Sequence, residues 1–236
     1  MHFASQKVKP KMKNLKNSKV YLTIFTLTIA LIFAGCGKSP ENKVQTTNST
    51  NISNQNYADA KELKIDVNQS IVEWLGKKVT GQHNGTVKIS EGNVYVKDNK
   101  LVGGTVKVDI RTLENTDLAS DPDSKKKLEG HLKSDDFFNA EKFNFITFVI
   151  SSVEESNDPS KPKYIVKGNL TIRDITKGVS FPANIDINGN NVTADINADI
   201  DRTDFGLKYG SGKFFEGLGD KAISDIFNLK IKITAK

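Results

Sequence analysis

Histidine and cysteine are sparse in this sequence of 236 residues, which limits the chemistry that it can support. Beyond the N-terminal segment only His83 and His131 occur, far apart in the chain, and no His-x-x-His or Cys-x-x-Cys spacing is present. A zinc site needs several such ligands held together, so none is predicted. A Gly-x-Ser-x-Gly nucleophile motif is also missing. We therefore expect no catalytic residues, no metal and no cofactor, and we predict that the protein is not an enzyme.

The acidic segment DIDRTDFG could suggest calcium, because it holds Asp199, Asp201 and Asp204 close together. Alternation places two of these carboxylates on the outward face of a strand, and no loop of the EF-hand type follows. Arg202 is instead expected to pair with Asp204 or with a neighbouring acid at the strand end. The segment YGSGKFFEG at 209–217 lacks the spacing of a phosphate-binding loop and is interpreted as a glycine-rich connection between strands.

Cys36 is the only cysteine, and it lies where an export signal would end. Lysines precede an uncharged apolar run at 20–33, and Ala34 and Gly35 come directly before the cysteine. This layout resembles a bacterial lipobox, although Phe33 stands where Leu, Val or Ile is usual. It predicts a lipoprotein signal peptide at 1–36, with Met12 as the true start, and acylation of Cys36. A chance cysteine after an ordinary signal is the alternative.

The acyl chains would tether an exported protein to a bacterial membrane, facing the periplasm or the cell surface. The chain has 34 basic and 28 acidic residues, and the lysines of the predicted signal account for the whole excess. The mature chain is therefore neutral, which argues against nucleic acid as a partner. The sequence leaves the oligomeric state open, a homodimer included.

Residues 37–61 are rich in Asn, Ser, Thr and Gln and hold few large apolar side chains. Such a composition cannot bury enough surface to fold, so this segment is predicted to be a flexible tether. The folded domain is expected at 62–236. Within it, apolar and polar residues alternate with a period of two, which predicts half-buried strands. The expected strands cover 71–78, 86–89, 94–97, 101–110, 145–153, 164–172, 179–187, 192–200 and 227–235.

Turn-forming residues at 90–93, 98–100 and 188–190 predict hairpins and an antiparallel sheet. One helical insertion is expected at 123–142, capped by Ser124 or Asp123. The pattern predicts an all-β barrel or sandwich. Small residues on the inward face could leave internal space or only permit tight coiling of the sheet. These small residues are Gly103 or Gly104, Gly168, Ala183, Ala194 and Ala198.

The segment GHLKSDDFFNAEKF places Phe137 and Phe138 directly after Asp135 and Asp136. The aspartates suit the amides at the start of a short helical turn that begins at Ser134. The phenylalanines would then leave on the opposite face, as a lid or rim beside the mouth of a barrel. Closure of the bottom of the core is the alternative.

Four blocks of sequence, in this order, resemble the YceI-like family of periplasmic polyisoprenoid-binding proteins. They are SIVEWLGKKVTGQHNGTVKI, GHLKSDDFFNAEKF, GNLTIRDITKGVSF and DIDRTDFGLKYG. The first block looks like the branch found as lipoproteins in Bacteroidetes-type bacteria. Asn144 departs from the family pattern, which usually has proline there. The resemblance implies an antiparallel eight-stranded lipocalin-like barrel with a short helical insertion, and neither catalytic residues nor a metal.

The resemblance also implies a hydrophobic channel that holds an isoprenoid, a quinone or a fatty amide. It places Trp74 on an early strand and Phe137 and Phe138 near the pore. The mouth candidates for a polar head group are His83, Asn84, Arg173 and Tyr209. Alternation predicts the remaining residues of the channel. The full set of predicted channel residues is Val72, Trp74, Val106, Val108, Phe137, Phe138, Phe148, Val166, Leu170, Phe181, Ile185, Ile196 and Phe227.

The sequence thus predicts a membrane-tethered protein that sequesters or carries a long apolar ligand. Each buried methylene contributes roughly 0.8 kcal/mol, so a chain of about twenty carbons outweighs an association cost of roughly 4–15 kcal/mol. The alternative is a non-enzymatic interaction or assembly partner of a membrane protein of the cytochrome type, with the barrel as its scaffold.

Overall fold

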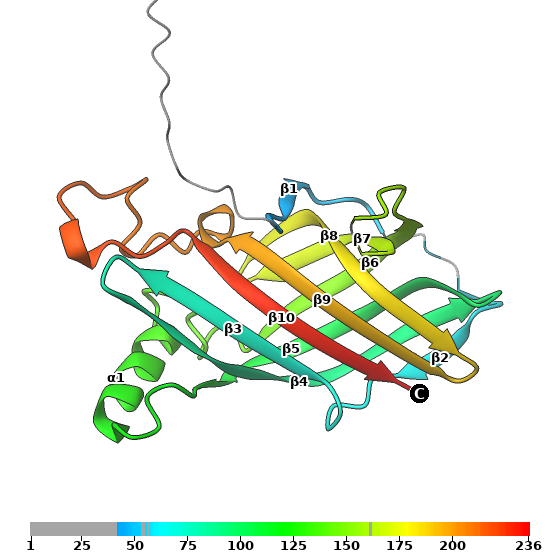
Figure 1. Ribbon diagram of the computed structural model, residues 1–236, viewed down its shortest axis with the longest axis horizontal. Coiled ribbons are helices and arrows are strands. Elements are labelled where there is room, and N and C mark those ends of the chain that lie inside the picture. The colour runs from blue at the N-terminus through cyan, green and yellow to red at the C-terminus, as the bar shows by residue number, and fades with distance from the viewer. Residues whose placement is uncertain (1–41, 53–54, 56, 161) are drawn as a thin grey trace, which may run out of the picture. The chain divides into compact units, whose positions relative to one another are not determined.

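The computed structural model describes residues 42–52, 55, 57–160 and 162–236. The predicted signal peptide, with Met12 and Cys36, lies outside the described residues. Within the described part of the chain, eight strands close into an antiparallel barrel in which each strand pairs with its neighbour in sequence, and the last pairs with the first (Figure 1). This confirms the predicted fold class. The barrel strands are β3 (Ile71–Lys78), β4 (Gly81–Lys97), β5 (Lys100–Asn115), β6 (Phe145–Glu155), β7 (Tyr164–Ile172), β8 (Ile175–Asn188), β9 (Asn191–Asp201) and β10 (Ile226–Ala235).

Two of the three predicted turns form the hairpins that the sequence indicates. Asp98 and Asn99 join β4 to β5 with φ values of 50° and 58°, and Gly189 joins β8 to β9 with a φ of 60°. Two-residue hairpins require this left-handed backbone, which Asn, Asp and Gly adopt at least cost. The local chemistry of these turns therefore sets the register of both strand pairs.

The predicted turn at 90–93 is wrong, because β4 passes through it as one continuous strand. The register against β5 shifts between Ile89 and Glu91, which is the signature of a bulge. A bulge absorbs one extra residue and lets pairing continue across a polar, glycine-containing stretch. Two short expected strands, 86–89 and 94–97, are in consequence a single long strand.

Part of the predicted tether at 37–61 is not flexible, because residues from Val44 onward pack on the barrel. Strand β1 (Gln45–Asn48) pairs with β8 over Lys177–Ser180, before β8 begins to pair with β9 at Ala183. Val44 is buried, and its backbone amide donates to the carbonyl of Asp199. Composition indicates disorder here because the segment has few large apolar side chains and cannot form a hydrophobic core by itself. It is nevertheless ordered, because β8 offers an unpaired edge.

Two further elements cover one end of the barrel each. Strand β2 (Lys61–Lys64) pairs with β4 near the β4–β5 hairpin. Helix α1 (Pro122–Lys133) lies at the opposite end, between β5 and β6 (Figure 1). None of the helices in the described part of the chain is long and apolar enough to cross a membrane.

Helix α1 is shorter than the expected helix at 123–142. Its N-cap is Asp121, whose side chain accepts a hydrogen bond from the Ser124 amide at 3.1 Å, in place of the expected Asp123 or Ser124. The helix ends at Ser134, which has extended backbone and donates its hydroxyl to the His131 carbonyl. Residues beyond Ser134 continue as hydrogen-bonded turns. The predicted second turn at Ser134 is therefore present, and it is separate from the helix.

Candidate functional site

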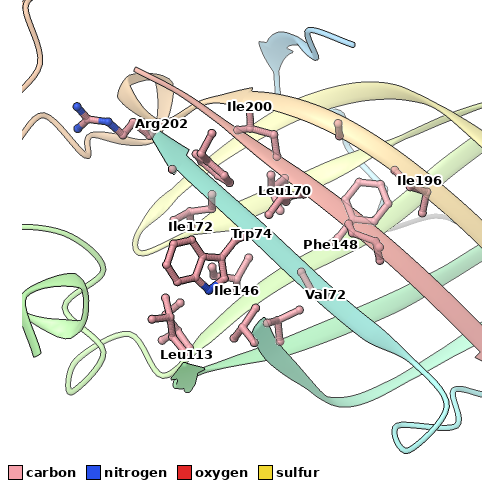
Figure 2. A pocket seen from close by; sticks show the side chains of 18 of the residues that line it. Val72, Trp74, Leu113, Ile146, Phe148, Leu170, Ile172, Ile196, Ile200 and Arg202 are labelled. Atoms are coloured by element: carbon pink, nitrogen blue, oxygen red, sulfur yellow. The ribbon is translucent and has the colours of Figure 1, made fainter. Parts of the chain in front are cut away.

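The barrel encloses a cavity of about 430 Å³, lined by inward side chains from all eight of its strands (Figure 2). Small-molecule sites in proteins have volumes of roughly 300–1,000 Å³. The walls are built almost wholly from branched aliphatic and aromatic residues, because one face of each alternating strand points inward. The interior of the barrel is therefore an apolar cavity with the volume of a small-molecule binding site.

Every channel residue predicted from the sequence lines this cavity. Contact of each residue with a ligand remains a prediction. Val72 and Trp74 come from β3, Val106 and Val108 from β5, Phe148 from β6, Val166 and Leu170 from β7, Phe181 and Ile185 from β8, Ile196 from β9 and Phe227 from β10, while Phe137 and Phe138 follow α1.

The small inward residues have two different roles. Ala183, Ala194 and Ala198 line the cavity and leave space in its wall. Gly168 instead makes room for an aromatic ring, because a Cβ there would lie 2.6 Å from the ring of Phe148. That ring packs against Phe181 with 5.2 Å between centroids.

The cavity reaches the surface between the β3–β4 hairpin and α1. Lys77, Lys78 and Gln82 line it and are also exposed, and His131 of α1 lines it from the other side. Phe137 is only 6% exposed, and its ring packs against His131 at 5.1 Å. Phe137 is buried and closes the core, as the alternative interpretation held. It lies beside the mouth, however, and not at the bottom of the core.

Of the four mouth candidates, only His83 lines the cavity, and its Nδ1 lies 2.8 Å from Asp117 Oδ2. The Asn84 side chain points elsewhere and donates to Thr116 Oγ1 at 2.9 Å. Neither Arg173 nor Tyr209 is among the lining residues. Their side chains support the wall from outside.

Arg173 donates to the Phe137 carbonyl at 3.1 Å, and Tyr209 stacks edge-on against His131 with 4.5 Å between centroids. The Arg173 contact holds the segment that follows α1, and the Tyr209 contact holds α1 itself. These two residues are therefore predicted to position the mouth and not to touch a ligand.

Arg202 lines the mouth end of the cavity, although sequence reasoning did not place it there. It is 4% exposed and donates to the carbonyls of Ser224, Leu207 and Ile223. Its guanidinium carbon lies 5.7 Å from the ring centroid of Phe137. Burial lowers the pKa of Arg202, although nearby Asp225 and Asp201 oppose this effect.

Two partners were expected for Arg202, Asp204 or a neighbouring acid at a strand end, and the structure shows the second, Asp225, directly before β10. Asp225 Oδ1 lies 3.5 Å from Arg202 Nη2 as an ion pair without hydrogen-bond geometry, whereas Asp204 accepts from Thr46 Oγ1 at 2.6 Å. Leu207 lies only five residues from Arg202, but Ile223, Ser224 and Asp225 lie more than twenty residues along the chain, so no local signal indicates these three partners.

Asp201, expected on an outward face, is buried at 6% exposure. Burial by itself would raise the pKa of Asp201, but hydrogen bonds from Lys213 at 2.7 Å and from Thr203 lower it below the ordinary range. These bonds fix the short helix η1 (Arg202–Phe205), which positions Arg202. Within the part of the chain that the structure describes, no group of three His, Cys, Asp or Glu residues could hold a metal ion.

Apolar side chains are exposed around the cavity mouth. We define the mouth patch as Val79, at the tip of the β3–β4 hairpin, with Phe214 and Phe215 in the loop before β10. They are 66%, 47% and 50% exposed. The Val79 amide donates to the Ala222 carbonyl at 3.2 Å, which joins the hairpin to this loop.

A closed antiparallel barrel around an apolar cavity is the architecture of lipocalin-type ligand-binding proteins. The model of the YceI-like domain matches residues 63–235, and the chain belongs to this family. A UPF0312 protein of Staphylococcus aureus strain MSSA476 is 35% identical over 88 residues, which are 34% of this chain and 47% of that protein. The chain thus spans about half the length of the curated relatives that it matches.

Two solved structures share the fold. BcnA of Burkholderia cenocepacia aligns with a TM-score of 0.57 at 23% identity, over 73% of this chain and 99% of that one. A polyisoprenoid binding domain from Saccharophagus degradans, implicated in plant cell wall breakdown, aligns with a TM-score of 0.51 at 12% identity, over 74% of this chain and 97% of that one. At these identities the likeness concerns the fold alone.

Proposed function

We propose that this protein binds a long-chain apolar lipid inside its barrel and sequesters or carries it at a bacterial membrane. The observation that carries the proposal is the cavity of about 430 Å³ with its continuous apolar wall. Such a wall offers no partner for a buried charge. Each methylene of a ligand that leaves water there contributes roughly 0.8 kcal/mol to the binding free energy. The polyisoprenoid binding of the Saccharophagus degradans domain, which shares the fold, supports an isoprenoid chain as the ligand.

We infer binding and not catalysis. Polar side chains lie only at the mouth end of the described cavity wall, where His83 and Arg202 are already engaged by protein partners. Catalysis on a lipid would require polar groups that converge deep in the site.

The membrane part of the proposal rests on two features of the chain. The sequence around Cys36 fits acylation of an exported lipoprotein. The mouth patch places exposed apolar side chains beside the opening, with Lys77, Lys78 and Lys208 nearby in sequence. Apolar and basic groups together suit contact with an anionic bilayer, from which a lipid ligand would enter.

Solvent extraction of protein purified from its native host, followed by mass spectrometry, tests the proposal. We expect one class of long-chain apolar molecule in roughly stoichiometric amount. Extracts with no such molecule, from protein that also fails to bind apolar probes, would leave the barrel as a scaffold for interaction with a membrane protein. Labelling of Cys36 by a fatty-acid analogue in growing cells tests the anchor separately.

A further inference from the structure

The cavity wall contains one buried polar atom that lacks a partner. Of the described side chains that line the cavity, only Trp74 has a buried nitrogen or oxygen without a hydrogen bond, and this atom is the indole Nε1. Figure 2 shows the Trp74 ring among Ile146, Ile172 and Leu113, with apolar groups around its nitrogen. A buried tryptophan N–H normally finds an acceptor, because leaving it unpaired forfeits the bond that it had with water.

Other polar groups of the wall are already occupied. All three nitrogens of the Arg202 guanidinium donate to backbone carbonyls. His83 contacts Asp117, and His131 contacts Asp136 at 3.2 Å. Ser224 donates its hydroxyl to the Ile226 carbonyl. The unpaired donor is therefore a property of Trp74 and not of the wall in general.

Strand register gives the depth of this donor. Trp74 pairs with Gly85, and Gly85 pairs with Asn115, the last residue of β5, at the end of the barrel that α1 covers. Phe148 pairs with Val106, and Val106 pairs with Gly92, further along β4 toward the opposite end. The Trp74 donor thus lies in the half of the cavity nearest the mouth, and the Phe148 and Phe181 rings lie deeper.

We propose that the ligand is an apolar chain that carries a carbonyl oxygen near one end. Because Trp74 Nε1 is itself buried in the wall, the apolar side chains beside it shift when the ligand binds, and Nε1–H then donates a hydrogen bond to this oxygen. The hydrocarbon part extends past Val72 toward Phe148. The inference rests on the proposed function and narrows it: ketone, quinone or amide ligands are favoured over a plain polyprenyl hydrocarbon. Trp74 then determines specificity, while the aliphatic wall supplies most of the affinity.

A matched pair of probes tests the inference on the full-length chain in lipid nanodiscs. The first is a long-chain methyl ketone, and the second is the isosteric alkene in which a methylene group replaces the carbonyl oxygen. Competition against a fluorescent fatty probe measures both affinities for the native protein and for the Trp74→Phe variant. Comparing the ketone-to-alkene ratio between the two proteins cancels the different partition of the probes into lipid.

We expect Trp74→Phe to reduce the preference for the ketone by roughly tenfold while alkene binding changes little. Ile146→Val, which trims the wall beside Trp74 without removing a donor, should weaken both probes to a similar extent. Because Trp74 is the only tryptophan of the chain, its indole N–H gives a single resonance in a ¹H–¹⁵N spectrum. The ketone should move this resonance downfield, and the alkene should not.

The outcomes separate this inference from the function on which it rests. Failure of both probes to bind would overturn the proposed function. Binding of both probes with the same ratio in Trp74→Phe as in the native protein, and no response of the indole resonance, would leave the carrier intact and overturn the role of Trp74.

Discussion

Trp74 and Gly85 lie directly opposite each other on β3 and β4, and the indole ring occupies the space that a side chain at Gly85 would need. A Cβ at Gly85 would come within 2.8 Å of Trp74 Cζ2 and 1.8 Å of the Glu114 carbonyl oxygen. The absence of a side chain on β4 thus permits the largest side chain of β3 to lie in the cavity wall.

Gly85→Ala should therefore destabilise the barrel by about 1–3 kcal/mol, the usual cost of overpacking. Urea unfolding measures the change. Gly81→Ala is the matched control, because a Cβ at that end of the same strand meets nothing within 4 Å. Equal stability of the two variants would contradict the packing that we describe.

Ala194→Phe should shorten the cavity at the end away from α1. Ala194 lines the cavity from β9 and pairs with Ile185 near the β8–β9 hairpin. The added ring would displace several methylenes of a long ligand, so we expect about tenfold weaker binding of the longest chains and little change for shorter ones.

Mass spectrometry of extracted ligand and competition with chains of graded length measure this effect. Asp195→Phe adds the same ring to the exposed face of the same strand and should leave length selectivity unchanged. An equal loss of affinity for chains of all lengths would show that long ligands do not extend to Ala194.

Phe214→Ser combined with Phe215→Ser should slow entry of ligand from vesicles that contain anionic lipid. Both rings are about half exposed in the mouth patch, and each would gain apolar burial at a bilayer surface, so we expect roughly tenfold slower transfer. Equilibrium affinity should stay the same, because neither ring lines the cavity.

Transfer of a fluorescent fatty probe from vesicles to the protein, followed through the Trp74 emission, measures the rate. The matched control is Val67→Ser combined with Ile71→Ser, since these residues are 39% and 37% exposed at the opposite end of β3. Equal slowing by both double variants would argue against entry at the mouth.

Protonation of Asp201 should lower the stability of the protein in acid. Its pKa lies below the ordinary value of 3.8 in the folded state, despite burial, because Lys213 and Thr203 donate to its carboxylate. Ionised Asp201 therefore stabilises the fold at pH values above 3.8, and this contribution is lost as the pH falls through the lower folded-state pKa.

Asp201→Asn should cost about 2 kcal/mol at neutral pH and flatten the decline of stability below about pH 4. Unfolding free energies measured across this range provide the test. Asp195→Asn, an exposed carboxylate on the same strand, should have a smaller effect. A decline in acid as steep as that of the native protein would show that Asp201 is not its source.

The cavity wall could be predicted from the sequence because side chains of a strand alternate strictly between two faces. Val179, Phe181, Ala183 and Ile185 are spaced by two residues, and three of them line the cavity. When one face of a strand is buried, a shift of register by one residue would expose all of its apolar side chains. The local alternation therefore predicts which side chains point into the barrel. Hairpins with Asp-Asn and Gly-Asn turns added the antiparallel order.

The mouth could not be predicted in the same way. Arg202 reaches the cavity because carbonyls of Leu207, Ile223 and Ser224 surround its guanidinium, and these arrive through a loop with no repeating pattern. Asn84 follows His83 directly, yet alternation turns its side chain away from the cavity. Loop residues have no fixed period, so their direction follows from distant packing.

By itself, the sequence determined the antiparallel strands, the apolar lining and the expectation of an acylated N-terminus at Cys36, and its resemblance to the YceI-like family implied the eight-stranded barrel. Tertiary structure alone decided that Val44 and β1 join the barrel, that Phe137 closes its end, and that the Trp74 indole is left without a partner. The physical reason is the range of the interactions. Alternation and turn geometry act between near neighbours in the chain, whereas edge pairing, burial of Arg202 and satisfaction of an indole N–H depend on groups that meet only when the barrel has closed.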